Sequence, residues 1–373
     1  MKARKLTCIM ISTVLIFSAI SGCSKDKDDE ETNVETVASD TAVTGEATDT
    51  SADPEAVVTE TAPVETSEAT PTPKPESHYE FDPHPYSPKL AEWIPQEYWD
   101  AFNNLSDAVR AGETTFECSS QEAYDWAIDD STIAQLLPAV CLKISGTSND
   151  GTTPYENGIG HIYYNMPIED LLVREAEFEQ MIEDILNSRL DDDDDDFEKI
   201  LKLYEYMEDT YYYESMPEGS GDGYVYYTMM TGKGICSNLA GVYAYLLMEA
   251  GVDAISMGCF DDLDHEWTYV VLDGESYHVD PTWALKSYYD VDYLELTYFM
   301  MDDDARVYSG CAIDDLTVQL LPEFWLNRTD LDLSCTSDRF DCLRYTYYRG
   351  LDEENDILYY YEYEDTLELY YGN

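Results

Sequence analysis

The clearest hydrophobic pattern lies in the middle of the chain. Apolar residues recur at intervals of three and four over 239–250, and Gly251 ends the pattern. This spacing places apolar side chains on one face of a helix. Two alternating runs follow, at 265–272 and 275–282, and Asp273-Gly274 separates them. An Asp-Gly pair between two such runs is a strong signal for a two-residue turn, so the pattern predicts a helix followed by a β-hairpin.

The segments on either side of this centre carry the same two periodicities. The pattern predicts helices at 95–111, 121–137, 168–190 and 197–210, and strands at 113–118, 140–145 and 160–165. Tyrosine-rich, partly alternating segments over 345–371 predict a terminal hairpin or a small antiparallel sheet. Such tyrosines could stack on sugars, but cross-strand packing is the simpler interpretation. The order of elements indicates an α+β fold with a helix packed on an antiparallel sheet at its centre.

The first residues form a separate unit. Basic residues precede an apolar run at 6–20, which is the pattern of an export signal. Ile20-Ser21-Gly22-Cys23 then resembles a bacterial lipoprotein signal, in which cleavage leaves Cys23 as the lipidated N-terminus. Acyl chains on Cys23 would hold the protein on the extracytoplasmic face of the bacterial cell membrane. The alternative is a plain secretory signal with an incidental cysteine.

Composition divides the rest of the chain. Residues 24–77 are rich in Thr, Glu, Ala, Asp, Ser and Pro and have almost no large apolar side chains, so we expect a disordered tether. Aromatic residues return at Tyr79. The expected parts are a signal peptide at 1–22, a tether at 23–78, an N-terminal α+β region at 79–190, a core at 191–308 that contains the central helix and hairpin, and a tyrosine-rich β segment at 309–373.

The charge of the chain limits its partners. A net charge of −59 excludes a general nucleic-acid binder, because the phosphate backbone would be repelled. A solvated acidic surface is the simplest explanation, and attraction of cationic partners is the alternative. The run 191–196 consists of six aspartates but lacks the glycine and the spaced ligands of an EF-hand loop. We interpret it as the solvated start of the helix that follows.

Candidate chemistry centres on the start of the central helix. Gly232 and Gly234 let the backbone turn tightly just before Cys236, which therefore lies at a helix N-terminus. The aligned amide dipoles there favour an anion, so the thiol should ionise more easily and become a better nucleophile.

The predicted hairpin brings a histidine and an aspartate together. If Leu272 pairs with Glu275 across the turn, Asp280 becomes the diagonal neighbour of His265 on the same sheet face. A hydrogen bond between them would fix the orientation of the imidazole. His278 lies further along the strand pair, so Asp280 is the better partner.

These motifs resemble bacterial members of the transglutaminase-like superfamily of papain-type thiol enzymes. A G-x-G-x-C segment, an H-x-W strand and an H-V-D-x-T-W strand occur in that order, and the similarity covers about 197–308. The resemblance implies a papain/transglutaminase-like core in which Cys236 is the nucleophile, His265 the base and Asp280 the orienting carboxylate.

The resemblance also implies an aromatic residue upstream that helps the oxyanion hole. Tyr226 is the best match, and Tyr224 and Tyr227 are alternatives. The chain departs from the family pattern at Ser237-Asn238, where Asp-Gly or Gln-Gly is frequent, and at Ser276, where an aromatic residue is usual. Both departures bear on substrate preference more than on the chemistry.

The combined prediction is a lipid-anchored thiol enzyme acting on amide or peptide bonds. An acyl-enzyme on Cys236 would give hydrolysis or deamidation with water and transamidation with an amine, so a protease, a peptidase, a deamidase and a transamidase all stay open. The expected substrate is a peptide or protein, such as a cell-wall peptide, and neither a metal nor an organic cofactor is needed. The alternative is a non-catalytic cell-surface binding or scaffold lipoprotein with a degenerate domain.

Other residues receive no catalytic role. His161 lies in a predicted strand and is interpreted as structural. No CxxC pair exists, so we do not expect a zinc site built on cysteines. A bridge between Cys335 and Cys342 is possible across a turn, although exported proteins can also leave thiols free. The cysteines whose pairing stays open are Cys118, Cys141, Cys259, Cys311, Cys335 and Cys342.

Overall fold

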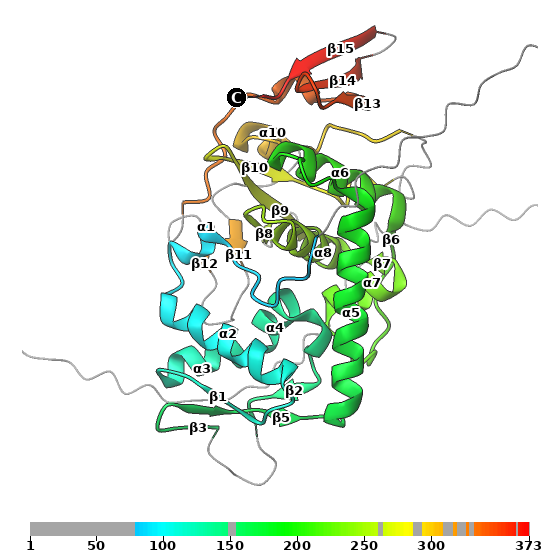
Figure 1. Cartoon of the computed structure of the whole chain (residues 1–373). Coiled ribbons are helices and arrows are strands. Elements are labelled where there is room, and N and C mark those ends of the chain that lie inside the picture. Colours follow the sequence, from blue (N-terminus) through cyan, green and yellow to red (C-terminus); the bar gives the residue numbers. More distant parts are fainter. Residues whose placement is uncertain are drawn as a thin grey trace, which may run out of the picture. The chain divides into compact units, whose positions relative to one another are not determined.

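A computed structural model describes most of the chain after residue 78 (Figure 1). The described residues are 79–147, 154–259, 264–285, 293–308, 316–318, 326–327, 332–362 and 365–372. The predicted signal peptide, the tether with Cys23, and Cys311 lie outside these ranges. Within the ranges, no helix combines the length and the apolar character needed to cross a bilayer.

Helices dominate the first described segment. They are α1 (Pro88–Ala91), α2 (Gln96–Arg110), α3 (Gln121–Ile128), α4 (Asp130–Leu136) and the short 3-10 helix η1 (Pro138–Val140). The single helix predicted at 121–137 is wrong, because the backbone of Asp129 is extended. The Asp129 carboxylate accepts a hydrogen bond from the Ser131 amide at 2.8 Å and so starts α4 as a new helix. Trp99 of α2 and Trp126 of α3 meet edge to face, with ring centroids 5.3 Å apart.

Two small antiparallel sheets accompany these helices. One has the strand order β1 (Thr115–Glu117), β4 (Ile159–His161), β3 (Tyr155–Glu156), and the other pairs β2 (Ile144–Ser145) with β5 (Tyr163–Tyr164). The strand predicted at 140–145 is therefore wrong over its first part, where η1 and a turn intervene. The ring of His161 stacks on that of Tyr163, with centroids 6.4 Å apart, in keeping with a structural role.

The long helix α5 (Ile168–Arg189) and α6 (Asp196–Thr210) agree with the predicted helices. The acidic run between them starts α6 as expected, since the Asp195 carboxylate accepts a hydrogen bond from the Glu198 amide at 2.9 Å. The expectation that the whole run is solvated is wrong for Asp194, which is buried. Lys202 pairs with Asp194 at 2.5 Å and with Glu353 at 2.7 Å, so the run also ties α6 to a later part of the chain.

The central sheet has the strand order β10 (Glu275–Val279), β9 (His265–Leu272), β8 (Ala254–Cys259), β11 (Leu316–Val318), β12 (Leu326–Asn327). Each neighbouring pair is antiparallel. The predicted hairpin register is confirmed, because Glu275 pairs with Leu272 and His278 pairs with Tyr269. The second strand ends at Val279, earlier than the alternating pattern indicates.

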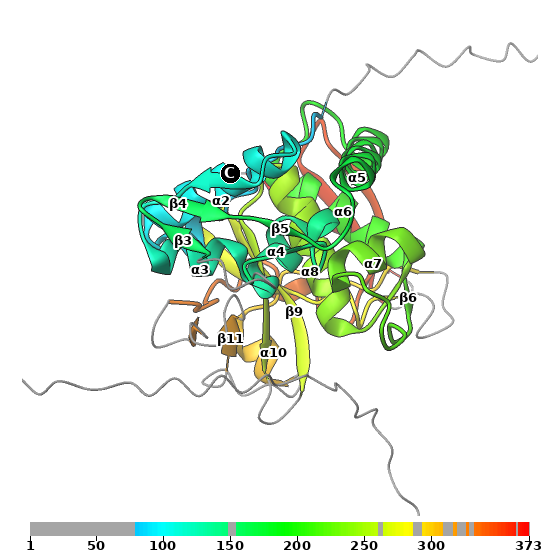
Figure 2. The same cartoon turned by 90° about the horizontal axis from the view of Figure 1, so that it is seen from below.

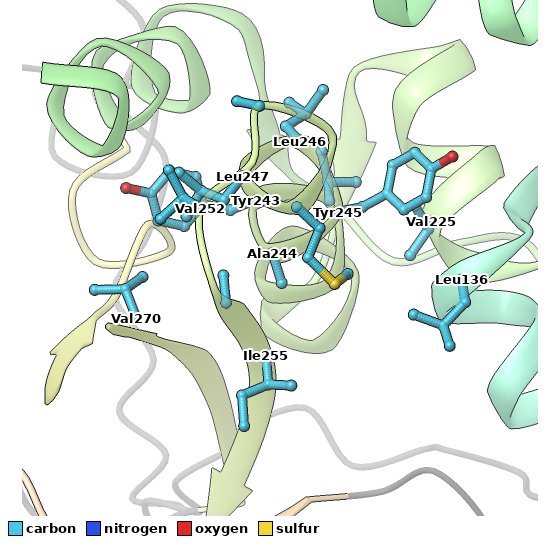
Figure 3. Close-up of a cluster of buried hydrophobic side chains, with 14 of the residues drawn as sticks. Leu136, Val225, Tyr243, Ala244, Tyr245, Leu246, Leu247, Val252, Ile255 and Val270 are labelled. Atoms are coloured by element: carbon cyan, nitrogen blue, oxygen red, sulfur yellow. The ribbon is translucent and has the colours of Figure 1, made fainter. Parts of the chain in front are cut away.

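The predicted central helix is α8 (Cys236–Glu249), and Gly251 follows it with a φ of 82°. The short β6 (Tyr212–Tyr213), α7 (Tyr224–Thr231) and β7 (Lys233–Gly234) lead into α8, and α7 lies beside it (Figure 2). The apolar face of α8 packs on β8 and β9. Figure 3 shows Tyr243 and Leu247 of α8 in one buried cluster with Ile255 of β8 and Val270 of β9. A helix packed on an antiparallel sheet therefore forms the centre of a mixed fold of helices and several antiparallel sheets.

The last elements are α10 (Asp303–Tyr308), the 3-10 helix η4 (Asp341–Leu343), and the strands β13 (Tyr347–Asp352), β14 (Ile357–Glu362) and β15 (Asp365–Tyr370). The three strands form an antiparallel sheet in that order, as predicted. After it, Tyr371 returns to α6, stacks on Phe197 at 4.4 Å and donates a hydrogen bond to Glu198 at 2.6 Å. These contacts give Tyr371 a packing role rather than an exposed one.

The cysteines of this last region do not form the bridge considered from the sequence. Cys335 is buried and its thiol donates a hydrogen bond to the Leu333 carbonyl, whereas Cys342 is exposed, and no disulfide joins them.

Candidate active site

The turn before α8 places Cys236 at the first position of the helix. Gly232 ends α7 with a φ of 72° and donates its amide to the Thr228 carbonyl at 2.8 Å. A side chain on Gly234 would put its Cβ 2.6 Å from the Cβ of Asn238, so the chain can pass there only with glycine. Cys236 itself is partly exposed, at the positive end of the helix dipole.

The side chain of Asn238 holds this turn together. Its Oδ1 accepts a hydrogen bond from the Ile235 amide at 3.1 Å, and its Nδ2 donates to the Tyr224 carbonyl at 3.3 Å. The side chain is buried. From the sequence, Ser237-Asn238 is only a departure from the family pattern, but in the structure Asn238 ties the backbone just before the nucleophile to α7.

The hairpin brings His265 and Asp280 into direct contact. The Nε2 atom of His265 lies 2.7 Å from Oδ2 of Asp280. His265 is 6% exposed and Asp280 is fully buried. The other carboxylate oxygen of Asp280 accepts the backbone amides of Thr282 at 3.1 Å and Trp283 at 3.3 Å. The carboxylate is therefore fixed at both oxygens, and its orientation fixes the imidazole.

The electrostatics join Cys236 to this pair. Burial alone would lower the pKa of His265, but the Asp280 charge and a hydrogen bond with the Cys236 side chain outweigh it and raise the pKa to about 9. Burial would likewise raise the pKa of Asp280, yet His265 and Arg306 hold it below its ordinary value. Because Nε2 of His265 faces Asp280, Nδ1 is the ring nitrogen left for the thiol. The arrangement can hold a thiolate beside a protonated imidazole.

Part of the chain is similar to a known family. Residues 184–281 match the family model described as the Transglutaminase-like superfamily. The match contains Cys236, His265 and Asp280.

This segment is a transglutaminase-like domain.

Two further comparisons add little. A solved structure of a candidate cysteine protease from Cytophaga hutchinsonii is similar with 18% sequence identity and a TM-score of 0.20, covering 22% of this chain and 30% of that protein. A likeness at that level carries no argument about activity. No curated protein matches the chain significantly.

Arg306 of α10 joins the transglutaminase-like domain from outside the matched segment. Its Nη1 donates to Oδ2 of Asp280 at 2.9 Å, and its side chain is completely buried. Arg306 is not among the site residues predicted from the sequence. A single basic residue after Asp302-Asp303-Asp304 was the available signal, but its partner is distant in the sequence.

Two tryptophans cover the imidazole. The ring of Trp283 stacks on His265 with centroids 4.6 Å apart and an angle of 8°, and Trp267 lies 6.0 Å from the same ring. Both occur in the motifs that carry the family resemblance, but neither is predicted from the sequence to have a role in the site. The stacked indole limits the access of water to the bond between His265 and Asp280.

His278 supports the domain from another position. Its Nδ1 accepts the indole N–H of Trp267 at 3.1 Å, which leaves Nε2 to donate to Asp303 at 3.2 Å. His278, Asp303 and Cys335 lie close enough to hold a metal ion. The cluster fits a metal poorly, because an ion on Nε2 would require a proton on Nδ1, and that proton would oppose the Trp267 donor.

A second group of metal-type ligands, Asp191, Asp194 and Glu353, already holds a cation. The ammonium of Lys202 lies within 3.5 Å of each carboxylate. The acidic run is thus used for ion pairing with a side chain of the same protein.

Tyr226, the tyrosine predicted for the oxyanion hole, lies in α7 and is buried. Its ring packs against Phe178 of α5 at 5.5 Å and lies under the Arg174 guanidinium, 3.3 Å from the ring centroid. These contacts give the ring a packing role. Its part in an oxyanion hole stays a prediction from the sequence.

Proposed function

We propose that this protein is a thiol enzyme that acts on amide or peptide bonds through an acyl-enzyme. The proposal rests on one continuous set of contacts, from the Cys236 thiol through the His265 imidazole to the buried Asp280 carboxylate. An imidazole between a thiol and a carboxylate can accept the thiol proton and keep it available for the next step. The transglutaminase-like domain over 184–281 supports the same class of chemistry.

The first half of the reaction uses Cys236 and His265. The Sγ thiolate forms a bond to the carbonyl carbon of the substrate, and the carbonyl oxygen takes the negative charge. The backbone amide of Cys236, at the N-terminus of α8, is placed to donate a hydrogen bond to this oxygen. The protonated imidazole then gives its proton to the leaving nitrogen as the carbon–nitrogen bond breaks, which leaves a thioester on Cys236.

The second half reverses these roles. His265 takes a proton from water or from a primary amine, which attacks the thioester carbon and releases Cys236. Water gives hydrolysis or deamidation, and an amine gives transamidation. Asp280 stays ionised throughout and keeps the imidazole in place. The acceptor therefore distinguishes a transamidase from a hydrolase, and the amide that is cleaved distinguishes a protease or peptidase from a deamidase.

We further propose that the enzyme works on the extracytoplasmic face of a bacterial membrane, held by a lipid on Cys23 and a tether over 24–77. The support is the signal-like sequence before Cys23 and the low apolar content of the tether. The net charge of −59 favours peptide or protein substrates with basic groups, such as cell-wall peptides, over nucleic acid. The anchor can be tested by mass spectrometry of the mature N-terminus. Membrane fractions are compared from cells that express the unaltered chain and from cells that express Cys23→Ala. An unlipidated mature N-terminus in the unaltered chain would refute it.

An activated ester tests the chemistry without knowledge of the substrate. The full chain in mild detergent is mixed with p-nitrophenyl acetate, and the burst of p-nitrophenol and the acetylated residue are measured by absorbance and mass spectrometry. We expect a burst of one equivalent and an acetyl group on Cys236. Adding cadaverine to the acetyl-enzyme in aqueous buffer then shows whether the acetyl group passes to the amine or to water.

The chain provides its own control for this experiment. Cys342 is exposed and has no part in the site, so it reports the reactivity of an ordinary surface thiol. The burst should disappear in Cys236→Ala and persist in Cys342→Ser. Equal acetylation of Cys236 and Cys342 would contradict the proposal and favour a non-catalytic binding or scaffold lipoprotein.

A further inference from the structure

Arg306 and His265 share one oxygen of Asp280. The Nη1 atom of Arg306 lies 2.9 Å from Oδ2, and Nε2 of His265 lies 2.7 Å from the same atom. Arg306 and Asp280 are both completely buried. The oxygen that orients the imidazole is therefore also bound by a permanent cation.

The same two indoles hold both side chains. The Cζ atom of Arg306 lies 4.0 Å from the ring centroid of Trp267 and 4.6 Å from that of Trp283. These are the rings that lie 6.0 Å and 4.6 Å from the ring of His265. Cation–π attraction keeps the guanidinium against the rings, so it cannot turn away from Asp280 without losing these contacts.

A contribution to the stability of the fold does not explain why an arginine occupies position 306. In the part of the chain that the structure describes, its Nε and Nη2 atoms are buried and have no hydrogen-bond partner. A buried guanidinium with unpaired donors carries a desolvation cost, and an apolar side chain in such a position is often neutral or stabilising. The charge of Arg306, rather than its bulk, is therefore the feature to explain.

We propose that Arg306 is a positioning residue of the site, which holds the Asp280 carboxylate and offsets part of its pull on the His265 proton. The imidazole can then release this proton to a leaving amine. The inference extends the proposed function and rests on it. It concerns a residue that lies beyond the segment matched to the transglutaminase-like family, which ends at residue 281.

Charged and titratable groups face His265 from each neighbouring element. Cys236 comes from α8, Asp280 follows β10 and Arg306 comes from α10. Glu266 lies next to His265 on β9; burial raises its pKa to about 7, and the His265 charge works against that rise. Tyr204 of α6 lies near Asp280, and burial holds its pKa well above the ordinary value. Glu266 can titrate near neutral pH, so Glu266→Gln serves as the background for the pH experiment.

The test is a titration of the His265 ring by NMR in the full chain, with histidine labelled at Cε1 and the signal assigned with His265→Ala. Removing the cation in Arg306→Met or Arg306→Gln should raise the pKa of His265 by about one or more, because a like charge no longer opposes protonation. Arg306→Lys keeps a charge on a less rigid side chain and should give a smaller rise. If neither charge-free variant folds, the pKa of His265 in Arg306→Lys tests the proposal on its own.

Two controls separate the possible failures. Arg339→Met removes an arginine that pairs with Asp273 at the hairpin turn and should leave the titration unchanged. Cys236→Ala should lower the pKa of His265, because the sulfur supports the imidazolium. No change in Cys236→Ala would refute the proposed function. A response in Cys236→Ala, together with an unchanged pKa in all folded Arg306 variants, would refute the role of Arg306 alone.

Discussion

One hairpin carries two buried histidines, each beside a carboxylate, and their surroundings give them different roles. His265 faces Asp280 through Nε2 and the Cys236 thiol through its other nitrogen. His278 faces Asp303 through Nε2, but its Nδ1 accepts the indole N–H of Trp267. The partner of the second ring nitrogen therefore separates a site for acid–base chemistry from a structural hydrogen bond.

The largest difference should appear when each histidine is replaced by glutamine. His265→Gln removes the base, so acetylation of Cys236 by p-nitrophenyl acetate should fall by about 10²- to 10⁴-fold. His278→Gln keeps an acceptor for Trp267 and should lower the rate by less than about tenfold, since this ring does not contact the thiol. Rapid-mixing measurements of the burst check both values. Equal losses in the two variants would remove the distinction between the histidines.

The two carboxylates should differ in what they contribute to stability. Asp280→Asn leaves Arg306 buried without its charge partner, so we expect the free energy of unfolding to fall by about 3 to 5 kcal/mol. Asp303→Asn should cost about 1 kcal/mol, because the side chain of Asp303 is partly exposed and its histidine is held from the other side as well. Urea unfolding measures both. A larger loss at Asp303 would mean that the second pair is the structural centre of the hairpin.

The pH dependence of stability should also report the charge on His265. Folding raises the pKa of His265 from 6.5 to about 9, so the protonated ring is stabilised in the folded protein. This stabilisation, on the order of 3 kcal/mol, is complete below the lower value and is lost as the pH rises through the higher one. Asp280 affects stability at low pH. Its contribution to the free energy of unfolding is lost as the pH falls through its lowered pKa.

Urea unfolding at pH 6 and pH 9.5 measures the effect. The stability advantage of the unaltered chain over His265→Gln should shrink between these two values. A constant difference would show that the ring of His265 is not charged in the folded protein.

The smallest effect is expected at Tyr226. Tyr226→Phe keeps the ring between Phe178 and Arg174, so the acetylation rate should change by less than about threefold. An oxyanion donor would instead cost about 10²- to 10³-fold when its hydroxyl is removed. Tyr224→Phe, measured beside it, tests the neighbouring tyrosine. A large loss in Tyr226→Phe would confirm the role that the family resemblance implies.

The predictable parts of the site are those set by local sequence. The spacing of three and four determines α8, and the Asp-Gly turn determines the register that places Asp280 beside His265. The start of α8 follows from Gly232 and Gly234, because one needs a positive φ and the other has no room for a side chain.

The parts that could not be predicted depend on contacts between distant segments. Arg306 contacts Asp280 only after α10 has packed beside the hairpin. The periodicity of apolar residues in the sequence does not predict such a pair. Asp194 is buried because Lys202 and Glu353 converge on the acidic run. The break at Asp129 has a local signal, since aspartate is a frequent helix cap, but apolar spacing on both sides conceals it.

The most direct test of the account is the pH dependence of Cys236 alkylation. The full chain is treated with limiting iodoacetamide from pH 5 to 9, and each cysteine is quantified by mass spectrometry in the unaltered chain and in His265→Ala. We expect Cys236 to react faster than every other cysteine at low pH. Its rate should fall to that of the exposed Cys342 when His265 is removed. If Cys236 reacts no faster than Cys342 at any pH, or keeps its advantage without His265, the thiolate–imidazolium pair does not exist.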